Sequence, residues 1–142
     1  MPRMTDQEYR EFLSEGTRTA KLATTRRDGS PHVVPIWFLL DGEDLILTTG
    51  KQSVKGRAIR RNGQVAVCVD DENPPYAFVM IEGTTTITEE PDEMLRFSTR
   101  LAARYVGEEK AEEYGRLNAA EGEMLVRVRP DKVVTENNTT GE

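Results

Sequence analysis

The stretch Asp28-Gly29-Ser30-Pro31-His32-Val33-Val34-Pro35-Ile36-Trp37-Phe38 decides the fold of this chain. Asp-Gly is a strong signal for a tight β-hairpin turn, and the following residues predict a strand over residues 32–40. This strand is apolar at odd and even positions alike, so both of its faces must be covered. We therefore expect a second subunit or a ligand on one face. Because Pro35 has no backbone N–H, we also expect a free edge or a bulge there.

Alternating apolar residues predict five further strands around this stretch. They cover residues 18–25, 45–49, 65–69, 76–89 and 123–129. Gly83 predicts a bend or bulge inside the long fifth strand, and Pro130-Asp131 predicts a turn before an extension over 132–135. Most neighbouring strands are joined by hairpin turns rather than by helices. This order favours a mainly β fold, an antiparallel six-stranded barrel, over a parallel sheet.

Local signals predict three or four helices at the periphery of the barrel. Thr5 and Glu8 form a capping box at the start of a helix, and Ser53 can cap a short helix over 54–61. Pro91 suits the first position of a helical segment that Gly107 interrupts. Because 142 residues fit one domain, we expect a single domain over 1–142. Its parts are an N-terminal helix (5–16), a barrel core (17–90), a helical segment (91–121) and a final strand (123–136).

The scarcity of histidine and cysteine excludes several kinds of site. The chain contains one of each, His32 and Cys68. A zinc site needs three or four clustered ligands, a catalytic triad would depend on His32 alone, and an intrachain disulfide is impossible. No apolar run approaches the ~20 residues of a membrane span, and no signal peptide is recognisable. We expect a cytoplasmic protein without metal, whose chemistry, if any, comes from an organic cofactor.

The charges are unevenly distributed along the chain. Its 19 basic and 25 acidic residues give a net charge of −6, which disfavours a general nucleic-acid binder. Two segments nevertheless contain no acidic residue. The first basic segment, residues 16–27, and the second basic segment, residues 45–69, contain the following cations: Arg18, Lys21, Arg26 and Arg27 in the first, and Lys51, Lys55, Arg57, Arg60 and Arg61 in the second.

The second basic segment contains the run Thr48-Thr49-Gly50-Lys51-Gln52-Ser53-Val54-Lys55. A strand end, a glycine and a capping serine precede a helix there, and free N–H groups at a helix N-terminus favour an anion. The Thr49 and Ser53 hydroxyls can donate hydrogen bonds, and Lys55 and Arg60 can neutralise a phosphate. The spacing differs from that of a P-loop. A solvated basic helix is the ordinary alternative, just as a packed core position is the alternative to a ring platform at Trp37.

Together these residues resemble the pyridoxamine 5′-phosphate oxidase-like family. The similarity runs through residues 17–90, and its motifs are the stretch quoted first, Asp41-Gly42, Thr48-Thr49, Ser53-x-Lys55 and Pro75-Tyr76-x-Phe78-Val79-x-Ile81-x-Gly83. Within the family, the chain looks closest to the subgroup that uses the deazaflavin coenzyme F420 rather than FMN. The resemblance implies a split β-barrel homodimer with two cofactor sites at the dimer interface.

The resemblance also implies which residues bind the cofactor. The ring would lie against Pro35, Ile36 and Trp37, and His32 would line the tail or the substrate region. Tyr76 would complete the pocket from the partner subunit. The phosphate-bearing tail would meet a set of polar and cationic side chains: Thr48, Thr49, Lys51, Ser53, Lys55 and Arg60. The basic segments suit the many negative charges of the F420 tail, a phosphodiester followed by glutamate carboxylates.

The function implied is hydride transfer between F420 and a small conjugated substrate. In such an enzyme the cofactor supplies the chemistry, and the protein binds and orients it. No side chain is assigned as catalytic. Two alternatives share the fold, namely an FMN-dependent oxidoreductase and a flavin- or F420-binding protein without turnover. A small nucleic-acid-binding barrel is the last alternative.

Overall fold

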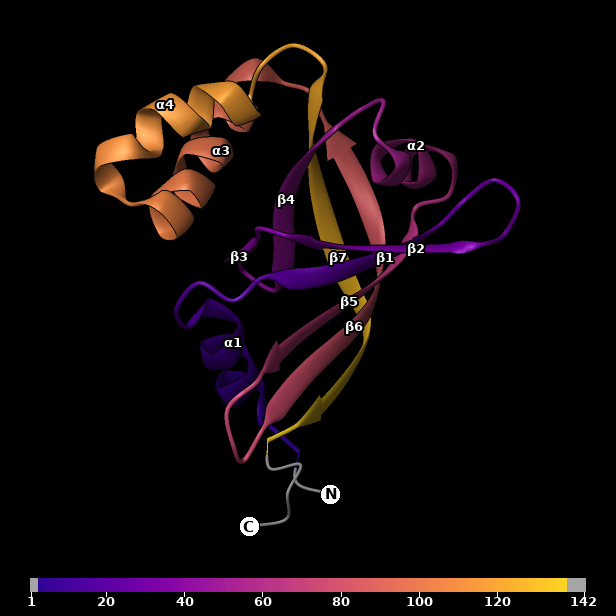
Figure 1. Cartoon of the computed structure of the whole chain (residues 1–142), viewed down its shortest axis with the longest axis vertical. Coiled ribbons are helices and arrows are strands. Elements are labelled where there is room, and N and C mark those ends of the chain that lie inside the picture. Colours follow the sequence, from indigo (N-terminus) through magenta and orange to yellow (C-terminus); the bar gives the residue numbers. More distant parts are fainter. Residues whose placement is uncertain (1–2, 138–142) are drawn as a thin grey trace.

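The computed structural model describes residues 3–137. The two ends of the expected domain, residues 1–2 and 138–142, lie outside the described residues. Residues 3–137 contain four helices, which lie around a strongly curved sheet (Figure 1). In chain order the elements are α1 (Asp6–Ser14), β1 (Ala20–Thr25), β2 (Pro31–Ile36), β3 (Leu39–Asp41), β4 (Asp44–Gly50), α2 (Val54–Arg61), β5 (Gln64–Asp71), β6 (Ala77–Thr88), α3 (Pro91–Val106), α4 (Glu108–Asn118) and β7 (Glu123–Glu136).

All seven strands belong to one antiparallel sheet with the order β2-β1-β5-β6-β7-β4-β3. Strands β2 and β3 are therefore its two edges, yet only Trp37 and Phe38 separate them in the sequence. Two residues of chain span only about 7 Å, so the sheet must coil until its edges meet at this link (Figure 1). No ladder joins the two edges, which makes the fold a split barrel. The predicted mainly β fold with peripheral helices is confirmed.

The number of strands differs from the expected six because the predicted strand over 32–40 is two strands. The ladder between β1 and β2 ends where Ala20 pairs with Ile36. A separate ladder begins where Leu39 pairs with Ile46. The chain thus changes pairing partner across the Trp37-Phe38 link. The expectation of a free edge at Pro35 is confirmed, since β2 lies at the edge of the sheet.

A β-bulge interrupts the regular pairing between the long strands β6 and β7. Gly83 pairs with Pro130 while Glu82 pairs with Lys132, so Asp131 is the extra residue. The bulge predicted at Gly83 is confirmed, and a Cβ atom there would approach the Val128 side chain and the Arg129 carbonyl. The turn predicted at Pro130-Asp131 is wrong, because β7 continues through both residues.

Apolar residues pack on both sides of the curved sheet. The barrel interior is filled by a cluster that includes Leu22, Phe38 and Val67, and Phe12 and Leu13 of α1 belong to the same cluster. A second cluster packs α3 against β3, β4 and β7, and its members are Leu39, Ile46, Met94, Phe97, Leu101 and Leu125. Helices α3 and α4 form a hairpin that covers this side of the sheet (Figure 1).

Candidate cofactor-binding site

Helix α2 begins with a well-formed cap directly after β4. The Ser53 hydroxyl accepts a hydrogen bond from the Gly56 N–H at 3.0 Å and donates one to the Gly50 carbonyl at 2.8 Å. The Thr49 hydroxyl lies 3.1 Å from it, and Thr49 is buried. The cap is confirmed. These two hydroxyls are engaged with the chain itself, so a phosphate at this turn would meet mainly the N–H groups of Val54 and Lys55.

Two carboxylates lie beside the predicted tail lysines. Lys51 forms an ion pair with Glu89, the residue that follows β6. Glu123, the first residue of β7, pairs in the ladder with Gly50 and interacts electrostatically with Lys55. Burial raises the pKa of the Glu123 carboxyl, and the positive charge of Lys55 opposes this shift. Lys55 thus remains the cation at this turn that has no ion pair within 4.0 Å among residues 3–137.

We expect Glu123→Gln to stabilise the protein at neutral pH. A folded-state pKa above the ordinary 4.5 means that folding favours the protonated carboxyl. The stabilisation due to protonation is complete below pH 4.5 and is lost as the pH rises through the raised value. The variant should therefore have a higher Tm than the wild type at pH 7 and an equal Tm near pH 4. Glu121→Gln, a substitution at an exposed neighbouring position, is the control. A Tm of Glu123→Gln that equals the wild-type Tm at pH 7 as well as near pH 4 would contradict the expectation.

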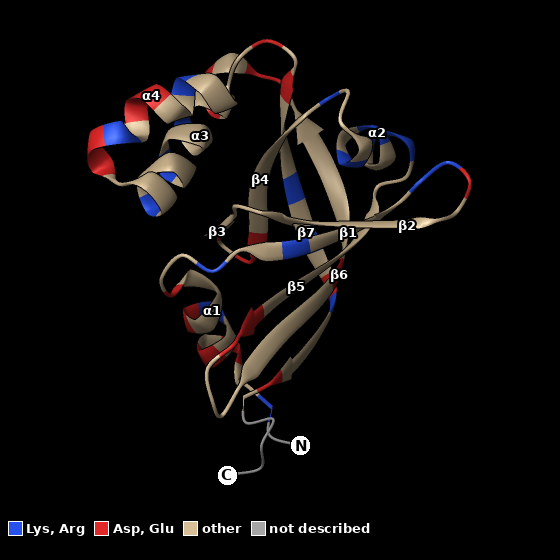
Figure 2. Ribbon diagram, viewed as in Figure 1, with Lys and Arg blue, Asp and Glu red and all other residues tan. Residues whose placement is uncertain are grey.

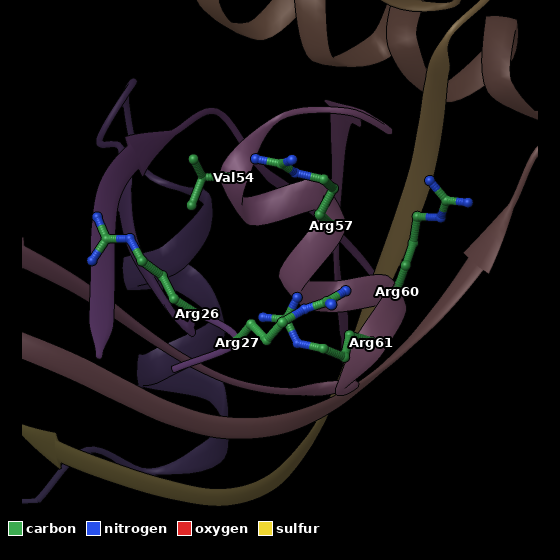
Figure 3. Close-up of a pocket in the computed structure, with 6 residues that line it drawn as sticks. All are labelled: Arg26, Arg27, Val54, Arg57, Arg60 and Arg61. Atoms are coloured by element: carbon green, nitrogen blue, oxygen red, sulfur yellow. The ribbon is translucent and has the colours of Figure 1, made fainter. Parts of the chain in front are cut away.

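A cavity of about 650 Å³ lies between α2 and the turn that joins β1 and β2 (Figure 3). Its lining residues are Arg26, Arg27, Val54, Arg57, Arg60 and Arg61. Arg61 donates a hydrogen bond to the Thr25 carbonyl at 2.8 Å, which ties the end of α2 to the end of β1. We call this the arginine cavity. It combines part of the first basic segment with most of the second.

The cations of the first basic segment separate into two groups in the structure. Arg18 pairs with Asp71, and Lys21 pairs with Asp70. The five arginines of the cavity, by contrast, form no ion pair with any residue between 3 and 137. Lys and Arg gather on α2 and on the adjacent β1–β2 turn (Figure 2). Such a concentration of uncompensated positive charge attracts a multiply charged anion.

A smaller cavity of about 190 Å³ lies on the other side of the first turn of α2. It is lined by Ile36, Trp37, Thr48, Lys55, Leu101 and Asn118. Four of these were predicted cofactor residues, and the last two belong to α3 and α4. We call it the tryptophan cavity. It combines apolar side chains, including an aromatic one, with an ammonium, a hydroxyl and an amide, as is common in sites for organic ligands.

The first turn of α2 contributes one lining residue to each cavity. Val54 lines the arginine cavity, and the next residue, Lys55, lines the tryptophan cavity. The described residues contain no cluster of three or more His, Cys, Asp or Glu side chains suited to a metal ion. None of the helices in residues 3–137 is long and apolar enough to cross a bilayer.

Comparison with known proteins now identifies the family. Residues 5–136 match the family model described as pyridoxamine 5′-phosphate oxidase. The chain belongs to the pyridoxamine 5′-phosphate oxidase family. A comparison with curated proteins gives no significant match.

Solved structures of similar fold include three of particular interest. A protein described as F420 reductase is 33% identical, with a TM-score of 0.69 over 87% of this chain and 94% of that one. The conserved hypothetical protein Rv2991 from Mycobacterium tuberculosis is 25% identical, with a TM-score of 0.83 over 94% and 85%. The heme storage protein HutZ from Vibrio cholerae is 19% identical, with a TM-score of 0.75 over 96% and 98%, and shows the fold alone.

This member of the pyridoxamine 5′-phosphate oxidase family brings most of the predicted site residues to one region. Ile36, Trp37, Thr48 and Lys55 share the tryptophan cavity. Arg60 lines the arginine cavity and donates to the Lys51 carbonyl at 3.4 Å, although it points away from the other four arginines (Figure 3). These predicted residues surround the first turn of α2.

Three predicted residues lie elsewhere. Pro35 is exposed on β2. His32, the second residue of the same strand, is half-buried, and its Nδ1 atom has no hydrogen-bond partner among the described residues. Tyr76 follows a cis Pro74–Pro75 bond, has a φ of 61°, and lines a different cavity, of about 290 Å³, together with Phe12 and Arg18. Within one chain, Tyr76 therefore does not contribute to the tryptophan cavity.

Sequence reasoning missed several lining residues of this family member. Arg26, Arg27, Arg57 and Arg61 were visible as members of acid-free segments, but their convergence on one cavity was not predicted. Leu101 and Asn118 gave no signal, because ordinary helix positions acquire a functional role only through the way that α3 and α4 pack.

Proposed function

We propose that the protein is a reductase that uses coenzyme F420 and transfers a hydride to a small conjugated substrate. The observation that supports it best is the pair of cavities that share the first turn of α2. One contains an aromatic platform, and the other contains five arginines without carboxylate partners among residues 3–137. An organic cofactor with a ring at one end and several negative charges at the other matches this pair.

The charge of the arginine cavity favours F420 over FMN. FMN ends in one phosphate, which one or two cationic side chains and a helix N-terminus suffice to bind. The arginine cavity supplies more positive charge than a single phosphate needs. The tail of F420 continues beyond its phosphodiester into several carboxylates, and Arg26, Arg27 and Arg57 are placed to bind them. The 33% identity to a protein described as F420 reductase supports the same choice.

The residues divide into distinct roles around this cofactor. Reduced F420, when bound, supplies the hydride. Trp37 and Ile36 would hold the ring, while Lys55 and the first N–H groups of α2 would bind the phosphodiester. Leu101 and Asn118 would face the substrate and limit the access of water. The chain thus binds and orients the reactants, and its single histidine is no obstacle to the reaction.

We further propose that a second copy of the chain completes the site. Edge strand β2 exposes Val33 at 63% and leads to Trp37 at 36% exposure. An exposed edge strand with apolar side chains is an association surface, and it lies next to the tryptophan cavity. Tyr76 would then reach that cavity from the partner subunit. Sedimentation velocity at micromolar concentration should show a dimer, whereas a monomer would contradict an interfacial site.

Titration of the purified protein with separate cofactors tests the proposal. Trp37 is the single tryptophan, so quenching of its fluorescence reports on the proposed ring site directly. We expect F420 to quench Trp37 at lower concentration than FMN does. Hemin is the third titrant, because a heme storage protein shares the fold. Tight binding of FMN or of hemin, but not of F420, would contradict the F420 proposal. Binding of F420 without hydride transfer to any acceptor tested would favour a binding protein without turnover.

The arginine cavity offers a variant that separates tail binding from ring binding. The side chains of Arg27 and Arg57 form no hydrogen bond or ion pair with the other described residues, so we expect the fold to tolerate glutamine at both positions. Arg27→Gln/Arg57→Gln should weaken F420 binding on the order of tenfold or more, since hydrogen bonds to charged groups are worth about 1.5–3 kcal/mol. The affinity for FMN should change much less. Lys110→Gln on α4 is the control, and equal effects on both cofactors would place the tail elsewhere.

A further inference from the structure

Residues in the last turn of α3 contact the Trp37-Phe38 link between the two edge strands of the barrel. The Tyr105 ring stacks on the Trp37 indole, with centroids 4.9 Å apart and planes inclined by 2°. The neighbouring Arg104 donates hydrogen bonds to the carbonyls of Phe38 at 2.6 Å, Leu13 at 2.8 Å and Gly16 at 3.1 Å. The link lacks the support of a strand ladder, so these contacts from α3 define its conformation.

The Tyr105 ring is itself fixed by its hydroxyl. This hydroxyl donates to the Arg18 carbonyl at 2.8 Å and accepts from the Phe38 N–H at 3.2 Å. Burial raises the pKa of the Tyr105 phenol above its ordinary value of 10, so the hydroxyl keeps its proton even at mildly alkaline pH. A phenol held at one end by backbone groups presents a rigid ring face to Trp37.

The orientation of Trp37 matters because its indole lines the tryptophan cavity beside Lys55 and Thr48. One face of the indole is covered by Tyr105, yet 36% of the residue remains exposed. The exposed part is available to a ligand. The indole can rotate about two side-chain bonds, and the stack with Tyr105 selects one orientation.

We infer that Tyr105 is a positioning residue of the cofactor site, which holds the Trp37 indole in the orientation that a planar ring requires. The inference rests on the proposed function, and it gives the helical segment between β6 and β7 a definite role. Tyr105 lines neither of the two cavities and would act on the site only through Trp37. Leu101 and Asn118, which line the same cavity, show that the α3–α4 hairpin reaches the site at more than one point.

The test compares two substitutions of Tyr105. Tyr105→Phe keeps the stacked ring and loses the hydroxyl, whereas Tyr105→Leu loses the ring. Stacked aromatic pairs contribute about 0.5–1.5 kcal/mol beyond burial, so Tyr105→Leu should raise the Kd for F420 by roughly three- to tenfold. Tyr105→Phe should keep the Kd within twofold, although its thermal stability falls because hydrogen bonds are lost. Tyr114→Leu, a half-buried tyrosine on α4 that lines neither cavity, is the matched control.

Near-UV circular dichroism of Trp37 provides a readout that needs no cofactor. Tyr105→Leu should lose the indole signal that Tyr105→Phe and Tyr114→Leu retain. A purely structural role would instead make the Kd follow the loss of thermal stability in all three variants, and that result would overturn the inference. If the wild type binds neither F420 nor FMN, the proposed function fails separately. An unchanged indole signal in Tyr105→Leu would then overturn the positioning role as well.

Discussion

The substitution Lys55→Glu is expected to weaken F420 binding by on the order of a hundredfold. Lys55 lines the tryptophan cavity and follows Val54, which lines the arginine cavity, so its ammonium lies where ring and tail of the cofactor would join. A charge-assisted hydrogen bond is about twice as strong as a neutral one, and the new carboxylate adds repulsion. The carboxyl of Glu123, which already interacts with Lys55, would add to that repulsion. Quenching of Trp37 fluorescence measures the affinity.

Two further variants test whether the loss of affinity depends on the charge at position 55 itself. Lys55→Gln removes the charge without adding the opposite one, and it should lie between the wild type and Lys55→Glu. Lys110→Glu changes the net charge by the same amount on α4, and it should leave the affinity unchanged. An unaltered F420 affinity in Lys55→Glu would show that Lys55 is not part of the site. Equal losses of affinity in Lys55→Glu and Lys110→Glu would show that the loss comes from the changed net charge of the protein and not from the position of Lys55.

The second large effect is expected from Gly56→Ala. Gly56 lies in the first turn of α2, and a Cβ atom there would overlap the Gly50 carbonyl oxygen and press on the Ser53 hydroxyl. Both are backbone or cap atoms that cannot yield without moving α2 away from β4. We expect a loss of about 2 kcal/mol or more in the free energy of unfolding, in spite of the better helix propensity of alanine. Urea unfolding followed by Trp37 fluorescence measures this loss.

The same displacement should impair binding as well as stability. Both cavities share the first turn of α2, so a shift of that turn changes their relative position. Gly50→Ala provides the control, because a Cβ atom at Gly50 would come no closer than 3.8 Å to the Glu123 carboxylate. Gly56→Ala with the stability of the wild type would show that the turn adapts easily, contrary to the close packing seen here.

Features set by neighbouring residues were predictable from the sequence. The capping box of Thr5 and Glu8 and the cap at Ser53 lie where expected, because each depends on side chains and N–H groups within three residues. The bulge at Gly83 was predictable as well, because a single glycine inside a strand pattern indicates it. The division of the expected strand over 32–40 was not predictable, since it depends on which partner strand each half meets.

The candidate site was only partly predictable for a similar reason. The acid-free segments indicated an excess of positive charge, but which of these cations lies beside a carboxylate depends on the elements that pack around it. Arg18 forms an ion pair with Asp71 on β5. Arg26 instead donates a hydrogen bond to the Pro31 carbonyl at 2.7 Å and has no carboxylate partner among residues 3–137. The stack of Tyr105 on Trp37 brings together positions 68 residues apart in the sequence, and no periodic pattern of apolar residues predicts such a contact.

The position of the α3–α4 hairpin within the chain has a consequence for how this scaffold diversifies. Strands β6 and β7 pair with each other along most of their length, so the hairpin is in effect a very long turn between two adjacent strands. Such connections accept insertions and exchanges without disturbing the ladder that they join. Within the hairpin, Leu101 belongs to the buried cluster on the sheet, whereas Asn118 lies outside that cluster and can vary more freely. On the proposed function, substrate preference can then change at such positions of the hairpin while the arginines of the arginine cavity stay unchanged.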